Sequence, residues 1–200
     1  KEDHQQRRFG EEADEHLAAG AERVYISARK IPQVEEAVAD FNSRYPDKVV
    51  GLPMDISTVE GCKKLAAELE SREEKLDILV NNAAWGAPYE EFPESGWDKV
   101  MDLNVKSPFF LTQALHGLLK KGAASGQLAK VINIGSIDGQ RLNPWETYSY
   151  HASKAAILWL TKRMAARLIT DGIVVTAIAP GAFQSDMNKA ARDHGDAVGQ

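Results

Sequence analysis

The 200-residue sequence lacks several features that mark common classes of protein. Cys62 is the only cysteine, so an internal disulfide is impossible and a reducing compartment is expected. No apolar run approaches the roughly 18 residues that a membrane-spanning helix needs, and no signal peptide is recognisable. Lysine and arginine never exceed two in a row and the net charge is −5, which argues against nucleic acid as a main partner. We therefore expect a soluble, cytoplasmic protein with neither a membrane nor a nucleic-acid partner.

Metal-ligand spacing is also absent. The histidines do not fall at the intervals typical of a metal site; they are His4, His16, His116, His151 and His194. No metal is therefore expected. Hydrophobic residues make up 44% of the chain, and this length suits one domain with a substantial core.

Short apolar segments alternate with amphipathic ones along the chain. Strands are expected at 24–28, 49–52, 76–80, 131–134 and 173–179, and helices at 11–19, 32–44, 57–74, 97–120 (with a bend near Pro108) and 148–170. The strands are continuously apolar, which is typical of a parallel sheet covered on both faces. We predict a doubly wound, Rossmann-like parallel α/β sheet in three α/β/α layers.

The helix expected at 148–170 begins with a phenol and an ammonium. Tyr150 and Lys154 are four residues apart, so they lie on one face of a helix. A positive charge about 4 Å away, at an effective dielectric of about 20, is worth about 4 kcal/mol. That is enough to bring the pKa of the phenol well below its usual value of about 10. The pair predicts a general acid and base near neutral pH, although the spacing alone could also arise by chance.

Five motifs occur in register: LDILVNNAA at 76–84, LNV at 103–105, VINIGS at 131–136, YSYHASKAA at 148–156 and IAPG at 178–181. Together, from about residue 24 to 187, they resemble the short-chain dehydrogenases/reductases, closest in texture to the 3-oxoacyl reductases. The resemblance implies a single dinucleotide-binding domain over residues 1–200. It also implies an NAD(P)-dependent oxidoreductase that interconverts a ketone, such as a 3-oxoacyl group, and a secondary alcohol.

The resemblance assigns roles to individual residues. Its catalytic set is Asn104, Ser136, Tyr150 and Lys154. Tyr150 would donate the proton, Lys154 would lower the pKa of the phenol and hold the nicotinamide ribose, Ser136 would hydrogen-bond the carbonyl, and Asn104 would hold a water. The implied cofactor-binding residues are Gly10, Arg29, Asp55, Ile56, Asn82, Ala83, Tyr150, Lys154, Pro180, Gly181 and Ser185. An arginine at position 29, where an acidic residue usually selects NAD, suits a 2′-phosphate, so NADP is expected.

Several of these assignments have plainer alternatives. Ser136 could be a strand-end turn residue, Asn104 could cap backbone groups, and Arg29 could be a solvated surface charge. A substrate pocket for an acyl chain or a bulky ketone could be lined by Trp85, Trp145, Phe183 and Met187. By the resemblance, the helices at 97–120 and 148–170 would pair across subunits of a homodimer or homotetramer.

The sequence departs from the family pattern at both ends. The family begins with an apolar strand and a TGxxxGxG turn, of which Gly10 is the only remnant. Ala84 replaces the glycine of the Asn-Asn-Ala-Gly motif, and the chain ends at Gln200, before the last family strand. We expect a domain truncated at both ends, with its first and C-terminal strands missing or replaced. A catalytically silent nucleotide-binding or protein-interaction subunit is therefore the alternative function.

Overall fold

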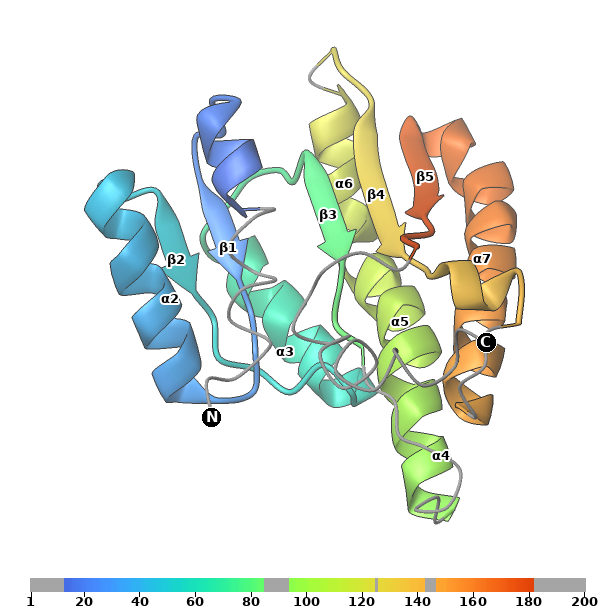
Figure 1. Cartoon of the computed structure of the whole chain (residues 1–200). Helices are drawn as coiled ribbons and strands as arrows, with labels where there is room; N and C mark the ends of the chain where they lie inside the picture. The colour runs from blue at the N-terminus through green and yellow to red at the C-terminus, as the bar shows by residue number, and fades with distance from the viewer. Residues whose placement is uncertain (1–12, 85–93, 125, 143–146, 182–200) are drawn as a thin grey trace. The chain divides into compact units, whose positions relative to one another are not determined.

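The computed structural model describes residues 13–84, 94–124, 126–142 and 147–181 (Figure 1). The described residues up to Asp55 form one compact unit, and those from Ile56 onward form a second. A single domain over residues 1–200 stays a prediction. No described helix is both long enough and apolar enough to cross a membrane.

The first unit is a two-stranded parallel sheet covered by helices. Strand β1 (Val24–Ile26) pairs with β2 (Val49–Gly51), and α2 (Ile31–Arg44) connects them and packs on β2. Residues 13–18 are also helical. The core of this unit consists of Ala13, Leu17, Ile26, Val34, Phe41 and Val49. Backbone pairing continues beyond the strands, from the Met54 amide to the Ala28 carbonyl at 2.9 Å, so the two carboxyl ends run on side by side.

The second unit holds a three-stranded parallel sheet in the order β3-β4-β5. Its strands are β3 (Ile78–Asn81), β4 (Ala129–Ile134) and β5 (Ile173–Ile178). Its α-helices are α3 (Val59–Glu70), α4 (Glu94–Met101), α5 (Ser107–Ala114), α6 (His116–Ala124) and α7 (Tyr148–Leu168). Three short turns complete it: the π-helical η2 (Asp102–Lys106) and the 3₁₀ turns η3 (Ile137–Gly139) and η4 (Ile169–Asp171).

The helices of this unit pack side by side and against its sheet. Both α6 and α7 contact β4 and β5, α3 contacts α5, and α7 contacts α4 and η2. The contact surface is apolar, with Leu115, Leu119, Val131, Ile157 and Ile173 almost wholly enclosed. Cys62 is 1% exposed, which fits a core residue rather than a nucleophile. The parallel pairing and the alternation of strands and helices agree with the predicted α/β class, with most boundaries within a few residues of the expected ones.

The expected missing strands concern residues at or beyond the limits of the described chain. In the described part, no strand precedes β1 or follows β5, and β1 and β3 each have a single strand partner, namely β2 and β4. The predicted replacement of the first and last family strands stays a prediction.

The predicted continuous helix at 97–120 was wrong. The structure divides this segment into α4, η2, α5 and α6. Pro108 has no N–H to donate to the carbonyl of Asn104, four residues earlier, so regular α-helical pairing cannot continue there. The chain instead makes a π turn, in which the Ser107 amide donates to the carbonyl of Asp102, five residues earlier.

A cluster of charges ties α6 to the end of α7. The side chain of Asp171, 13% exposed, lies 2.8 Å from Arg167 Nη1, 3.0 Å from His116 Nε2 and 3.3 Å from Lys120 Nζ. The hydrogen bond from Arg167, followed by those from His116 and Lys120, lowers the pKa of Asp171 from 3.8 to about 2. The ionised carboxylate therefore stabilises the fold, because its proton affinity is lower in the folded chain.

We expect Asp171→Asn to lower the melting temperature at pH 7, since Arg167, Lys120 and His116 lose the carboxylate that they share. A depressed carboxyl pKa contributes stability that is present above pH 3.8 and is lost as the pH falls through about 2. The difference in melting temperature between wild type and Asp171→Asn should therefore become smaller as the pH is lowered from 5 toward 2 in thermal unfolding scans.

The matched control is Asp77→Asn, which removes one exposed ion pair with Lys75. Such pairs contribute little, so this variant should melt close to the wild type at every pH. Equal melting temperatures for Asp171→Asn and wild type at pH 7 would contradict the stabilising role of the cluster.

Candidate active site

The first turns of α7 carry the phenol and the ammonium that the sequence singled out. Tyr150 is half-buried, and Lys154 is only 3% exposed. Lys154 Nζ donates a 2.8 Å hydrogen bond to the carbonyl of Ile134 at the end of β4. The same nitrogen lies 5.5 Å from the centroid of the Tyr150 ring. The structure therefore brings the pair together at the carboxyl end of a central strand.

Ser136 lies two residues beyond Ile134, where β4 passes into η3. It is 8% exposed, and its Oγ accepts a 3.1 Å hydrogen bond from the Asp138 amide as the N-cap of η3. Ser136 thus lies in a turn at the end of a strand, and its role in catalysis stays a prediction. A hydroxyl can accept and donate at once, so this contact leaves the O–H able to bind a carbonyl oxygen.

Asn104 lies in the π turn η2 and is 2% exposed. Its Nδ2 donates a 3.0 Å hydrogen bond to Ser153 Oγ, and Ser153 Oγ donates at 2.8 Å to the carbonyl of Tyr150. This amide thus binds a side chain of α7. Both its implied role in holding a water and the alternative of capping backbone groups stay predictions. Sequence reasoning missed Ser153; its position immediately before Lys154 was the only available signal.

The ends of β3 and β5 reach the same part of the unit. The Ile137 amide donates to the Pro180 carbonyl at 2.9 Å, which places Pro180 and Gly181 beside the turn that follows Ser136. Asn82 and Ala83 are half-buried and follow β3, whose last residue, Asn81, donates at 2.8 Å to Asn133 Oδ1 on β4. Asn133 in turn donates to Thr161 Oγ1 on α7 at 2.9 Å. A polar ladder therefore connects β3, β4 and α7.

Gly139 lets η3 approach α7 closely. A Cβ at this position would lie 2.5 Å from the carbonyl carbon of Lys154 and 2.6 Å from its oxygen. Both are backbone atoms, which cannot move aside as the end of a flexible side chain can. The turn that begins at Ser136 thus lies against the backbone of Lys154 because residue 139 has no side chain.

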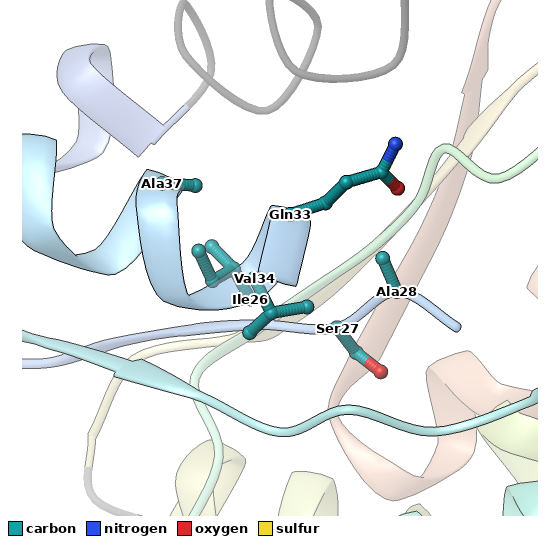
Figure 2. Close-up of a pocket in the computed structure, with 6 residues that line it drawn as sticks. All are labelled: Ile26, Ser27, Ala28, Gln33, Val34 and Ala37. Atoms are coloured by element: carbon teal, nitrogen blue, oxygen red, sulfur yellow. The ribbon is translucent and has the colours of Figure 1, made fainter. Parts of the chain in front are cut away.

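The first unit holds the residues expected around the adenosine end of a dinucleotide. Arg29 and Asp55 are exposed and follow the paired carboxyl ends of β1 and β2. Next to Arg29 is a small hollow between β1 and the first turns of α2, lined by Ile26, Ser27, Ala28, Gln33, Val34 and Ala37 (Figure 2). Ser27 and Ala28 project from opposite sides of the chain in Figure 2. The exposure of Arg29 fits both a ligand contact and a solvated charge, so its role stays a prediction.

The remaining predicted residues are distributed as follows. Ile56 is half-buried and begins the second unit, where its carbonyl lies 3.3 Å from Cys62 Sγ. Gly10 and Ser185 lie outside the described residues, as do the pocket candidates Trp85, Trp145, Phe183 and Met187. Within the described ranges, no group of three or more histidine, cysteine, aspartate or glutamate side chains could hold a metal ion.

Comparisons with known proteins bear on the family and the fold of the chain. A model of the family described as short chain dehydrogenase matches residues 6–196. The rhamnolipids biosynthesis 3-oxoacyl-(acyl-carrier-protein) reductase of Pseudomonas aeruginosa is 44% identical over 178 residues, covering 86% of this chain and 67% of the relative. The 2-dehydro-3-deoxy-D-gluconate 5-dehydrogenase of Bacillus subtilis is 40% identical over 144 residues, covering 70% of this chain and 54% of the relative. The chain thus spans about two thirds or less of these relatives.

Solved structures give the same result. The Pseudomonas aeruginosa RhlG/NADP active-site complex superposes with a TM-score of 0.82 at 41% identity, over 90% of this chain and 70% of that one. A short-chain dehydrogenase from Streptomyces avermitilis gives 0.74 at 31% identity, over 88% of this chain and 62% of that one. The predicted Rossmann-like α/β fold is confirmed.

We expect Gly139→Ala to destabilise the chain by about 1–3 kcal/mol, because the added methyl group meets backbone on both sides of the Lys154 peptide bond. Chemical denaturation measures the change. Gly117→Ala in α6 is the control, since a Cβ there has no atom within 4 Å. The control should be neutral or stabilising, as alanine favours a helix over glycine. Equal stability of the Gly139 variant and wild type would show that η3 does not depend on this close approach.

Proposed function

We propose that this chain, which belongs to the short-chain dehydrogenase family, reduces 3-oxoacyl substrates with NADPH. Membership of that family confirms the predicted class, an NAD(P)-dependent oxidoreductase that acts between a ketone and a secondary alcohol. The observation that carries the proposal is the buried ammonium of Lys154 beside the Tyr150 ring. A buried charge is costly unless it is partnered and used. In this position it favours the ionised form of the phenol, which is what a general acid and base near neutral pH requires.

The residues of each unit fit a dinucleotide. In the first unit, an exposed arginine follows the carboxyl end of β1, which suits a phosphate. In the second, Asn82, Pro180 and Lys154 follow or face strand ends, where ligands bind in parallel α/β sheets. When bound, the cofactor supplies the hydride.

The chain's own residues supply the proton and orient the carbonyl. In the proposed reaction the Tyr150 hydroxyl donates its proton to the carbonyl oxygen as the alcohol forms. The Ser136 hydroxyl donates a hydrogen bond to the same oxygen, while its lone pair keeps the bond from the Asp138 amide. Lys154 lowers the pKa of the phenol and contacts the ribose. Arg29 recognises a 2′-phosphate, so NADPH is preferred to NADH.

The substrate class has support from similarity. A 3-oxoacyl reductase is the relative with 44% identity, and a structure similar to this chain was solved as an NADP active-site complex. A sugar-acid dehydrogenase at 40% identity shows how far substrates diverge on this scaffold. The assay below therefore includes a simple ketone as well as a thioester.

We expect the chain to oxidise NADPH in the presence of acetoacetyl-CoA. With this substrate the rate should be higher for NADPH than for NADH. With NADPH the rate should be higher for acetoacetyl-CoA than for a simple ketone such as cyclohexanone. Tyr150→Phe should lower kcat by about 10²–10⁴-fold, because it removes the proton donor, while NADPH fluorescence still reports binding. Tyr148→Phe, which alters an exposed phenol two residues earlier, should keep wild-type turnover.

Two outcomes would overturn the proposal. Turnover that survives Tyr150→Phe would remove the phenol from the reaction. NADPH binding without turnover of either carbonyl would favour the catalytically silent subunit instead.

We also propose a homodimer or homotetramer in the cytoplasm, formed through the outward face of α7. That face exposes 71% of Trp159, and Ala152 and Ala155 on the same helix are exposed as well. A large apolar side chain flanked by small ones suits packing against a second helix. Sedimentation velocity should give the mass of at least a dimer, reduced by Trp159→Glu; a monomer at all concentrations would contradict the assembly.

A further inference from the structure

A fully enclosed serine connects two members of the proposed catalytic set. Ser153 is 0% exposed, and its Oγ accepts a 3.0 Å hydrogen bond from Asn104 Nδ2. The same oxygen donates at 2.8 Å to the carbonyl of Tyr150, three residues earlier. Its neighbour in the chain is Lys154, whose ammonium binds the end of β4. The hydroxyl thus joins η2 to the helical turn that carries both the phenol and the ammonium.

The Asn104 side-chain amide needs a fixed hydrogen-bond acceptor. Asn104 lies in a π turn forced by the missing N–H of Pro108, so its backbone is not held in a regular α-helix. Its side chain is 2% exposed, and a buried amide donor that loses its acceptor is costly. The Ser153 oxygen supplies an acceptor that is itself fixed, because its proton is directed to the Tyr150 carbonyl.

We propose that Ser153 is a positioning residue for the reaction, which it serves by fixing the Asn104 amide against the first turns of α7. The inference rests on the proposed function, since it acts through Asn104, Tyr150 and Lys154. Ser153 is 0% exposed, so it acts through its neighbours and not by contact with substrate or cofactor. Its loss should therefore affect turnover more than the binding of NADPH.

Ser149 provides a control within the same helix. It lies one turn before Ser153 and is also 0% exposed, but its Oγ has no hydrogen-bond partner in the described part of the chain. Replacing either serine by alanine removes one oxygen from a closed site in α7. The two variants differ in whether that oxygen binds Asn104.

The kinetic test compares Ser153→Ala, Ser149→Ala and Asn104→Ala with wild type, using NADPH and acetoacetyl-CoA. Ser153→Ala should lower kcat by about ten- to a hundredfold, because the Asn104 amide loses the acceptor that fixes it against α7, with little change in the KM for NADPH. Ser149→Ala should keep wild-type kcat. In the Asn104→Ala background, Ser153→Ala should cause no further loss, because the residue it acts through is already gone.

A second measurement decides the matter independently of turnover. Backbone amide exchange over residues 102–106 should accelerate in Ser153→Ala and stay unchanged in Ser149→Ala, since only the first variant releases the π turn. If the wild type reduces neither acetoacetyl-CoA nor cyclohexanone, the proposed function fails. Amide exchange over residues 102–106 then still shows whether Ser153 fixes Asn104.

Three results would overturn the inference: equal kcat for the two serine variants, a full additional loss from Ser153→Ala in the Asn104→Ala background, or exchange over 102–106 that responds to neither serine. Each would mean that the Asn104–Ser153 bond is a packing contact without influence on the reacting groups.

Discussion

The burial of one ammonium group is the constraint on which the second unit depends. Lys154 Nζ is nearly enclosed, and a charge in that position is costly unless polar groups surround it. The Ile134 carbonyl meets that need from the end of β4, and the Tyr150 ring lies against the ammonium from the same helix. The contact with Ile134 requires α7 to lie close to the end of the sheet. Gly139 allows η3 to lie against the backbone of α7, and Ser136 is the residue at which this turn begins.

Buried polar contacts hold α7 in the register that this arrangement needs. The Asn81–Asn133–Thr161 ladder links two strands to the middle of the helix, and Asn104 and Ser153 link its beginning to η2. Hydrogen bonds in a closed interior specify one arrangement, because each alternative leaves a donor or acceptor unpaired. At the far end, the charges around Asp171 tie the helix to α6. Packing thus buries α7, while polar contacts fix its position along the sheet.

The sequence predicted the α/β fold and the Tyr150–Lys154 pair because both follow from local patterns. Continuous apolar strands, helical stripes and the four-residue spacing of Tyr150 and Lys154 are all readable along the chain. Ser153 and Gly139 were missed because their reasons are not local. The first matters through Asn104, 49 residues away, and the second through a backbone atom of α7 that it must approach. The helical spacing of apolar residues over 97–120 likewise gave no sign of the break at η2, although Pro108 did predict a bend. Arg29 stays a prediction, since an exposed arginine fits a phosphate and a solvated surface equally well.

The measurement that tests the central claim most directly is a titration of the Tyr150 phenol. A ¹³C label at the tyrosine Cζ reports ionisation of each phenol by NMR, and Tyr150→Phe identifies the signal. We expect the Tyr150 midpoint to lie well below the usual pKa of about 10 and to rise toward it in Lys154→Met. A midpoint at the usual value, unchanged when Lys154 is replaced, would contradict the account.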